Sequence, residues 1–168
     1  DVADAEAALA GARDIIAEKI NEDAVVRSRM RTLYLQQGVM ATKVVTGQEE
    51  AGANYRDYFE WAEPLKSAPS HRVLAARRGA KEGFLSLSIS PPQDLALGII
   101  NRLFVADRGQ AKGAEADQIR TAGADAFKRL LSTSLQTEMR LEAKKRADGE
   151  AIGVFAENLE NLLLAAPL

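Results

Sequence analysis

The stretch that decides the fold is Asn54–Ile89, which reads NYRDYFEWAEPLKSAPSHRVLAARRGAKEGFLSLSI. It combines an aromatic cluster, two prolines, a short basic segment and a run in which apolar residues alternate with serine. The sequence on either side has the apolar periodicity of amphipathic helices. We therefore expect an irregular middle region into which the flanking helices pack.

The run from Phe84 to Ser90 is the clearest strand signal in the chain, because its leucines and isoleucine fall on one face and its serines on the other. Pro91 and Pro92 end it. Its hydrogen-bonding partner could be Val39–Thr46, a hairpin arm near Lys81, or a strand from a missing domain. Val39–Thr46 itself could be a strand, an extended link or a short helix.

The other segments predict helices. They are Ala5–Ile20, a helix from Asp23 to Gln37, Glu49–Trp61, Ser70–Arg78, Asp94–Ala106 and three segments within Glu115–Ala166. Asp23 and Ser70 are suitable N-caps, and Gly38 and Gly79 are suitable stops. Thr133–Gln136 has capping-box spacing and predicts a break in the tail. The predicted fold class is mainly α: a multi-helix packed array with at most a small β element near residues 39–46 and 84–90.

Composition excludes several classes of protein. A chain of 168 residues, 46% of them hydrophobic, can form one ordinary domain. A net charge of -2 excludes a strongly basic nucleic-acid binder, although local basic patches remain compatible with it. The absence of cysteine excludes disulfides and thiolate zinc sites. No apolar run approaches the roughly 20 residues of a membrane span, so we expect a cytoplasmic protein with no membrane partner.

Several separated blocks resemble the bacterial transcription accessory protein family Tex. In the middle of the chain they are YRDYFEWAEPL (Tyr55–Leu65), PSHRVLA (Pro69–Ala75) and RGAKEGFL (Arg78–Leu85). ARDIIAEKINED (Ala12–Asp23) and AIGVFAENLENLLLAAPL (Ala151–Leu168) resemble the segments before and after them in that family. Blocks that match in the right order are more specific than any one motif.

The resemblance implies a non-enzymatic helical scaffold that supports nucleic-acid binding, of RNA or DNA, and contacts with the transcription machinery. In the family, the chain continues into ribonuclease-H-like, helix-hairpin-helix and S1 domains, and nucleic-acid binding depends heavily on the S1 domain. None of these domains is recognisable in the sequence, which begins at Asp1 without an initiator Met. We therefore expect residues 1–168 to be one helical domain or segment of a larger Tex-like protein.

A basic cluster is the candidate nucleic-acid site. Its residues are Arg72, Arg77, Arg78 and Lys81. Cations near a helix C-terminus also interact favourably with the helix dipole, so a purely structural role is the alternative. A second basic cluster, within Arg140–Arg146, is interpreted as a solvated helical face.

The aromatic cluster has two interpretations. Tyr55, Tyr58, Phe59 and Trp61 could stack on nucleic-acid bases, but aromatics spaced by three and four along a helix favour core packing. A function without nucleic acid is also open: a helical protein–protein interaction module that docks through the Trp61 region or the apolar face of Ile152–Leu163.

Catalysis has few candidate residues. Glu60, Glu63 and His71 are the only ones that suggest an acid–base site. The chain has one histidine and no metal-ligand pattern. We therefore expect no enzyme activity, no cofactor, no metal and no small-molecule substrate.

Overall fold

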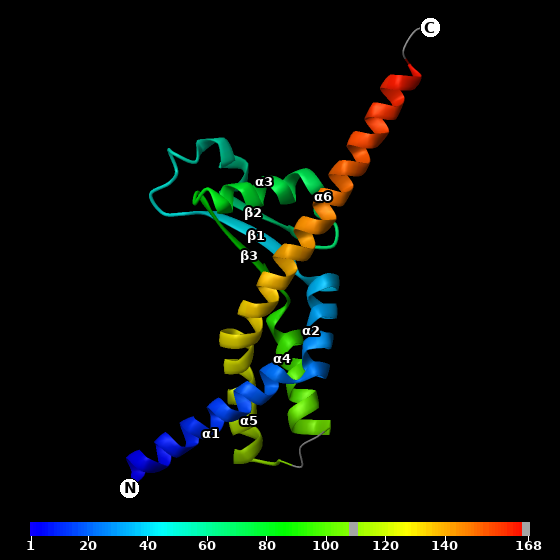
Figure 1. The fold of residues 1–168 in the computed structure, drawn as a ribbon. Coiled ribbons are helices and arrows are strands. Elements are labelled where there is room, and N and C mark those ends of the chain that lie inside the picture. The colour runs from blue at the N-terminus through cyan, green and yellow to red at the C-terminus, as the bar shows by residue number, and fades with distance from the viewer. Residues whose placement is uncertain (108–110, 166–168) are drawn as a thin grey trace. The chain divides into compact units, whose positions relative to one another are not determined.

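The computed structural model describes residues 1–107 and 111–165, and Figure 1 shows its fold. The chain divides into two compact units. The first unit comprises Asp1–Gly38 and Ser90–Thr137, and the second comprises Val39–Ile89 and Glu138–Leu168. Of the described residues, 73% are helical, and a small antiparallel sheet accompanies the helices, which confirms the predicted fold class. Whether the chain folds as one domain stays a prediction.

The first unit is built from helices that form a core of their own. Its elements are α1 (Val2–Glu22), α2 (Ala24–Gln37), α4 (Gln93–Asn101), the π-helical segment η2 (Arg102–Asp107), α5 (Ala114–Asp125), the π-helical segment η3 (Ala126–Leu131) and the start of α6 (Ser132–Leu164). Helix α1 packs on α5 and η3, and α2 packs on α4. The interpretation of one central hub did not anticipate this separate core, which includes Ile20, Met30, Ile100 and Leu131.

The ends of α2 confirm the predicted signals. The Oδ1 atom of Asp23 accepts hydrogen bonds from the backbone N–H groups of Val25 and Val26, both at 2.9 Å. These bonds satisfy two donors that the first turn of a helix leaves unpaired. Gly38 ends the helix and donates its N–H to the Tyr34 carbonyl at 2.8 Å.

The second unit contains a three-stranded sheet with the order β2-β1-β3. Its elements are β1 (Val39–Val44), the 3₁₀ segment η1 (Ala53–Tyr58), β2 (Glu60–Pro64), α3 (Ser70–Lys81), β3 (Leu85–Ser90) and the rest of α6. Of the predicted alternatives for the partner of β3, Val39–Thr46 is the correct one, because its residues Val39–Val44 form β1, which pairs with β3. Figure 1 shows α3 beside this sheet.

The predicted helix over Glu49–Trp61 is wrong. Residues 53–58 form only a short 3₁₀ segment, and Trp61 lies in β2 opposite Thr42 of β1. Pairing with β1 gives Glu60–Pro64 backbone hydrogen-bond partners along one edge, which overrides the local helical spacing. The aromatic residues are half-buried, so the core-packing interpretation holds only in part. The rings of Tyr58 and Trp61 pack edge to face, with their centroids 5.5 Å apart.

Both predicted ends of α3 need correction. Ser70 is the first helical residue, the N-cap is Pro69, and no side chain caps the helix. The helix also continues past Gly79 to Lys81. Gly79 is buried, and a Cβ there would lie 2.9 Å from Leu85 Cγ, so its role is close packing against β3. The turn after the helix instead uses Gly83, whose φ is 84°.

The predicted breaks in the tail are also wrong, because α6 runs continuously from Ser132 to Leu164. Thr133 does not cap a helix: its hydroxyl donates to the Arg129 carbonyl one turn back, at 3.3 Å. Such a bond satisfies the polar side chain inside a helix without ending it. The predicted end of the tail, Ala166, lies outside the described residues.

Candidate nucleic-acid interface

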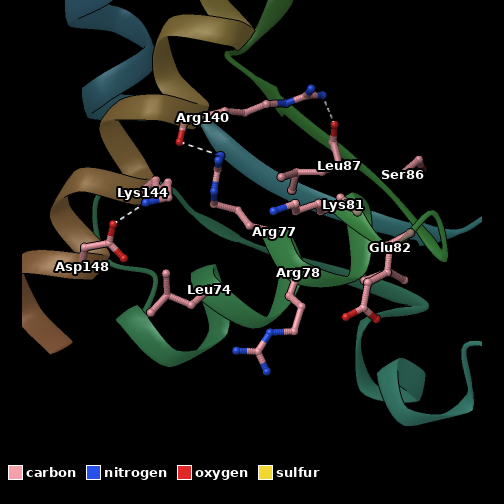
Figure 2. Close-up of a pocket in the computed structure, with 12 residues that line it drawn as sticks. Leu74, Arg77, Arg78, Lys81, Glu82, Ser86, Leu87, Arg140, Lys144 and Asp148 are labelled. Atoms are coloured by element: carbon pink, nitrogen blue, oxygen red, sulfur yellow. Dashed lines mark hydrogen bonds and ion pairs between the residues drawn. The ribbon is translucent and has the colours of Figure 1, made fainter.

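A groove of about 1280 Å³ in the second unit lies between α3, β3 and α6, and Figure 2 shows it from close by. It is lined by Leu74, Arg77, Arg78, Ala80, Lys81, Glu82, Leu85, Ser86, Leu87, Arg140, Lys144 and Asp148. Leucine side chains provide much of its apolar surface, and arginine and lysine side chains provide its positive charge. We refer to this cavity as the basic groove.

The structure separates the predicted site residues. Arg77, Arg78 and Lys81 line the basic groove, whereas Arg72 does not. Arg72 forms an ion pair with Glu63, whose carboxylate also accepts a hydrogen bond from the Trp61 indole N–H at 3.2 Å. A paired cation is less available to an external anion. Three of the predicted residues are thus brought together, and the fourth lies outside the groove.

Two further cations of the basic groove come from α6. Arg140 and Lys144 lie one helical turn apart and face α3 and β3, about sixty residues earlier in the sequence. The sequence interpretation placed them on a solvated face, which is wrong for Arg140 because it is half-buried. Their spacing predicts that they share one face of the helix, but only the tertiary structure shows that this face packs toward α3 and β3.

The arginines of the basic groove are held by backbone carbonyls. Arg77 Nη1 donates to the Arg140 carbonyl at 2.9 Å, and Arg140 Nη2 donates to the Leu87 carbonyl of β3. A carbonyl fixes the guanidinium but does not neutralise its charge. Within the described parts of the chain, neither arginine forms an ion pair with a carboxylate.

The two carboxylates of the basic groove have partners of their own. Asp148 pairs with Lys144 at 2.6 Å, and Glu82 accepts a hydrogen bond from the Tyr55 hydroxyl at 2.9 Å. Desolvation of the hydroxyl and its bond to Glu82 raise the pKa of Tyr55 above its ordinary value of 10.0. The groove therefore carries more positive than negative charge, although the whole chain is slightly acidic.

Glu60, Glu63 and His71 do not converge on the basic groove. Glu63 is tied to Arg72, and the other two side chains are exposed on β2 and α3. Among the residues that the structure describes, no group of three His, Cys, Asp or Glu side chains could hold a metal ion. Across the same residues, no helix combines the length and apolar character that a membrane span requires.

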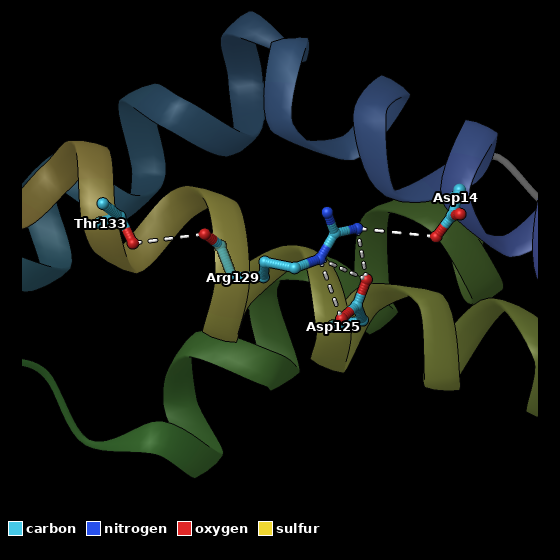
Figure 3. A network of polar contacts seen from close by, with 4 residues as sticks. All are labelled: Asp14, Asp125, Arg129 and Thr133. Atoms are coloured by element: carbon cyan, nitrogen blue, oxygen red, sulfur yellow. Dashed lines mark hydrogen bonds and ion pairs between the residues drawn. The ribbon is translucent and has the colours of Figure 1, made fainter.

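The first unit contains a contrasting arginine site, shown in Figure 3. Arg129 Nη2 lies 2.9 Å from Asp125 Oδ2 and 3.6 Å from Asp14 Oδ1. The hydrogen bond from Arg129 is the main cause that lowers the pKa of Asp125, with the guanidinium charge adding to it. We refer to these residues as the Arg129 cluster. Through these contacts the cluster connects α1 to α5 and η3. Because two carboxylates already balance the charge of Arg129, the cluster has little attraction for a further anion.

These features define a class: a mainly helical protein with a small antiparallel sheet and a basic groove on one of its two units. Residues 1–155 match the family described as Tex central region-like. The chain belongs to this family, which confirms the resemblance.

Named relatives agree with the family assignment. The chain is 39% identical to Protein YhgF of Escherichia coli (strain K12) and 37% identical to Protein tex of Bordetella pertussis. It is 36% identical to Transcriptional accessory protein Tex of Neisseria gonorrhoeae. These matches cover 98 to 99% of this chain but 22% of each relative, so the chain spans about a fifth of their length.

Proposed function

We propose that this chain is a non-catalytic scaffold within a Tex-like transcription accessory protein of the cytoplasm. In this role it contacts RNA or DNA through the basic groove and supports contacts of the longer protein with the transcription machinery. Family membership and the name of the gonococcal relative support the accessory role. The positions of Glu60, Glu63 and His71 outside the basic groove support a role without catalysis.

The observation that carries the nucleic-acid contact is the basic groove itself. Segments of α3 and α6 that are distant in sequence bring five cations to one cavity: Arg77, Arg78, Lys81, Arg140 and Lys144. Four of them form no ion pair among the described residues, whereas Lys144 is paired with Asp148. Unpaired cations in a groove attract phosphates and release the counterions that surround a nucleic acid. Because the chain has a net charge of -2, this attraction is local to the groove.

A salt titration of binding tests the proposal. The groove variant carries Arg78→Ala, Lys81→Ala and Lys144→Ala, which leaves the carbonyl-bound Arg77 and Arg140 in place. Fluorescence anisotropy would follow binding to single- and double-stranded DNA and RNA. We expect the variant to bind at least about tenfold more weakly at low salt and to show a shallower dependence of log affinity on log salt, by roughly 0.7–0.9 for each lost phosphate contact.

The matched control carries Lys19→Ala, Lys112→Ala and Lys128→Ala, three exposed lysines of the first unit. It removes the same charge away from the groove. We expect its salt dependence to stay close to that of the unmodified chain. Equal losses in both variants, or no binding by the folded chain, would contradict the groove as the nucleic-acid interface.

A protein-interaction function has its own supporting observation. The apolar side chains of α6 from Ile152 to Leu163 that were predicted to share a face are between 48% and 71% exposed. Extended apolar patches of this kind are typical of binding surfaces. Purified RNA polymerase can stand for the transcription machinery in a light-scattering binding assay. A complex that forms with the unmodified chain and is lost with Phe155→Asp and Leu162→Asp would favour this function.

A further inference from the structure

The basic groove is closed on one side by a side chain. Arg140 leaves α6 and crosses to β3, where its Nη2 donates to the Leu87 carbonyl, as Figure 2 shows. This bridge lies across the path between the helix and the strand. A polymer that continued straight past this point would have to displace the Arg140 bridge. The closed side therefore suits the end of a strand better than its middle.

Cationic groups gather next to this bridge. In Figure 2, the ends of Arg77 and Lys81 point into the space between α6 and β3, whereas Arg78 points away from it. The Arg140 Nε–H is buried and has no hydrogen-bond acceptor among the described residues. Because this N–H is closed off from solvent, it leaves the Arg140 charge uncompensated on that side but is not itself open to a ligand.

The charge at the closed side favours a doubly charged anion. In the part of the chain that the structure describes, Arg77, Lys81 and Arg140 form no ion pair, and the groove carboxylates Glu82 and Asp148 bond to other side chains. A phosphate monoester carries about -1.5 to -2 charges at neutral pH and three acceptor oxygens. A phosphodiester within a strand carries a single negative charge.

We propose that the closed side of the basic groove binds the terminal phosphate of a nucleic-acid strand. Arg77, Lys81 and Arg140 contact the terminal phosphate, and the more exposed Arg78, which points away from the closed side, contacts the phosphodiesters that follow. This inference rests on the proposed function and adds the chemical group that the site selects. It also gives Arg140 two roles, since the same side chain closes the groove and contacts the phosphate.

The test compares single-stranded oligonucleotides of one sequence that end in a 5′-phosphate, a 3′-phosphate or hydroxyls only. A fluorophore on the end opposite the phosphate reports the dissociation constant by anisotropy. We expect the full chain to bind one of the phosphorylated forms about tenfold or more tightly than the hydroxyl form, because charge-assisted contacts to the additional charge are gained. Lys81→Ala should remove most of this preference and retain the weaker binding.

Lys145→Ala is the matched control, since it deletes an exposed lysine of α6 that does not line the groove. It should keep the preference. Circular dichroism on both variants checks that they fold, and Lys81 is itself exposed, so its truncation leaves the core intact.

The possible outcomes separate the two proposals. Binding with equal affinity for phosphorylated and hydroxyl ends would overturn the terminal-phosphate inference and leave the nucleic-acid interface standing. No binding of any oligonucleotide by the folded chain would overturn both. A phosphoserine peptide that bound more tightly than the phosphorylated oligonucleotide would also overturn the inference, in favour of a phosphoprotein ligand.

Discussion

The Arg129 cluster and the basic groove use the same side chain in opposite ways. Arg129 is paired with the carboxylates of Asp125 and Asp14. Arg77 and Arg140 are held by backbone carbonyls. In the first case the partner neutralises the charge, and in the second it only fixes the position of the group. The type of acceptor, more than the number of arginines, therefore decides whether a basic cluster can bind an external anion.

Reversing one charge in the basic groove should have the largest effect. Lys81→Glu places a carboxylate next to Arg77 and Arg140 and gives the groove the balanced character of the Arg129 cluster. We expect nucleic-acid affinity at low salt to fall by about a hundredfold, because an attraction is lost and a repulsion is added. Anisotropy titrations at several salt concentrations measure this. An affinity close to that of the unmodified chain would show that the groove is not the binding surface.

Truncating the bridge should weaken both binding and stability. Arg140→Ala removes a groove cation and the donor to the Leu87 carbonyl. We expect about a tenfold loss of affinity and a decrease of roughly 1–2 kcal/mol in the free energy of unfolding, since that carbonyl loses its partner. Urea unfolding and anisotropy measure the two effects. A loss of affinity without a loss of stability would mean that the bridge is not part of the folded structure.

The Arg129 cluster should respond differently to truncation. Arg129→Ala removes exposed ion pairs, which contribute little to stability because water and salt screen them. We expect a decrease of no more than about 2 °C in the melting temperature and no change in nucleic-acid affinity. Differential scanning calorimetry and anisotropy provide the comparison with Arg140→Ala. A clear loss of affinity would remove the distinction between the two arginine sites.

Lowering the pH should weaken the Arg129 cluster slightly. The pKa of Asp125 is below its ordinary value of 3.8 in the folded chain, because Arg129 hydrogen-bonds to the ionised form. Its stabilising contribution is therefore present above the unfolded pKa and is lost as the pH falls through the lower folded pKa. We expect a small difference in melting temperature between the unmodified chain and Asp125→Asn at pH 6, which shrinks below pH ~4. A difference that grows on acidification would contradict this assignment.

Local signals predicted the elements whose stability is local. Asp23 and Gly38 bound α2 as expected, because a cap satisfies the helix ends without distant partners. Glu49–Trp61 was assigned incorrectly since its conformation depends on pairing with Val39–Val44, which periodicity within the segment does not report. The predicted break at Thr133–Gln136 also failed, because the Thr133 hydroxyl bonds within the helix.

The candidate site was only partly predictable. Arg77, Arg78 and Lys81 are close in sequence, so their clustering is visible in the chain itself. The pairing of Arg72 with Glu63 depends on the position of β2, and the contribution of Arg140 and Lys144 depends on how α6 packs within the second unit. Neither the Arg72–Glu63 pair nor the approach of α6 to α3 can be predicted from the spacing of residues in the sequence.

The sequence by itself determined the family, the mainly helical class and the presence of a basic segment in the middle of the chain. Composition, helix periodicity and the order of sequence blocks can all be recognised in short stretches or in the chain as a whole, without knowledge of distant contacts. Tertiary structure decided which cations share a groove and which are neutralised. The physical reason is that the interaction between two charges depends on the distance between them: residues some sixty positions apart affect one another strongly only when folding brings their side chains within a few ångströms.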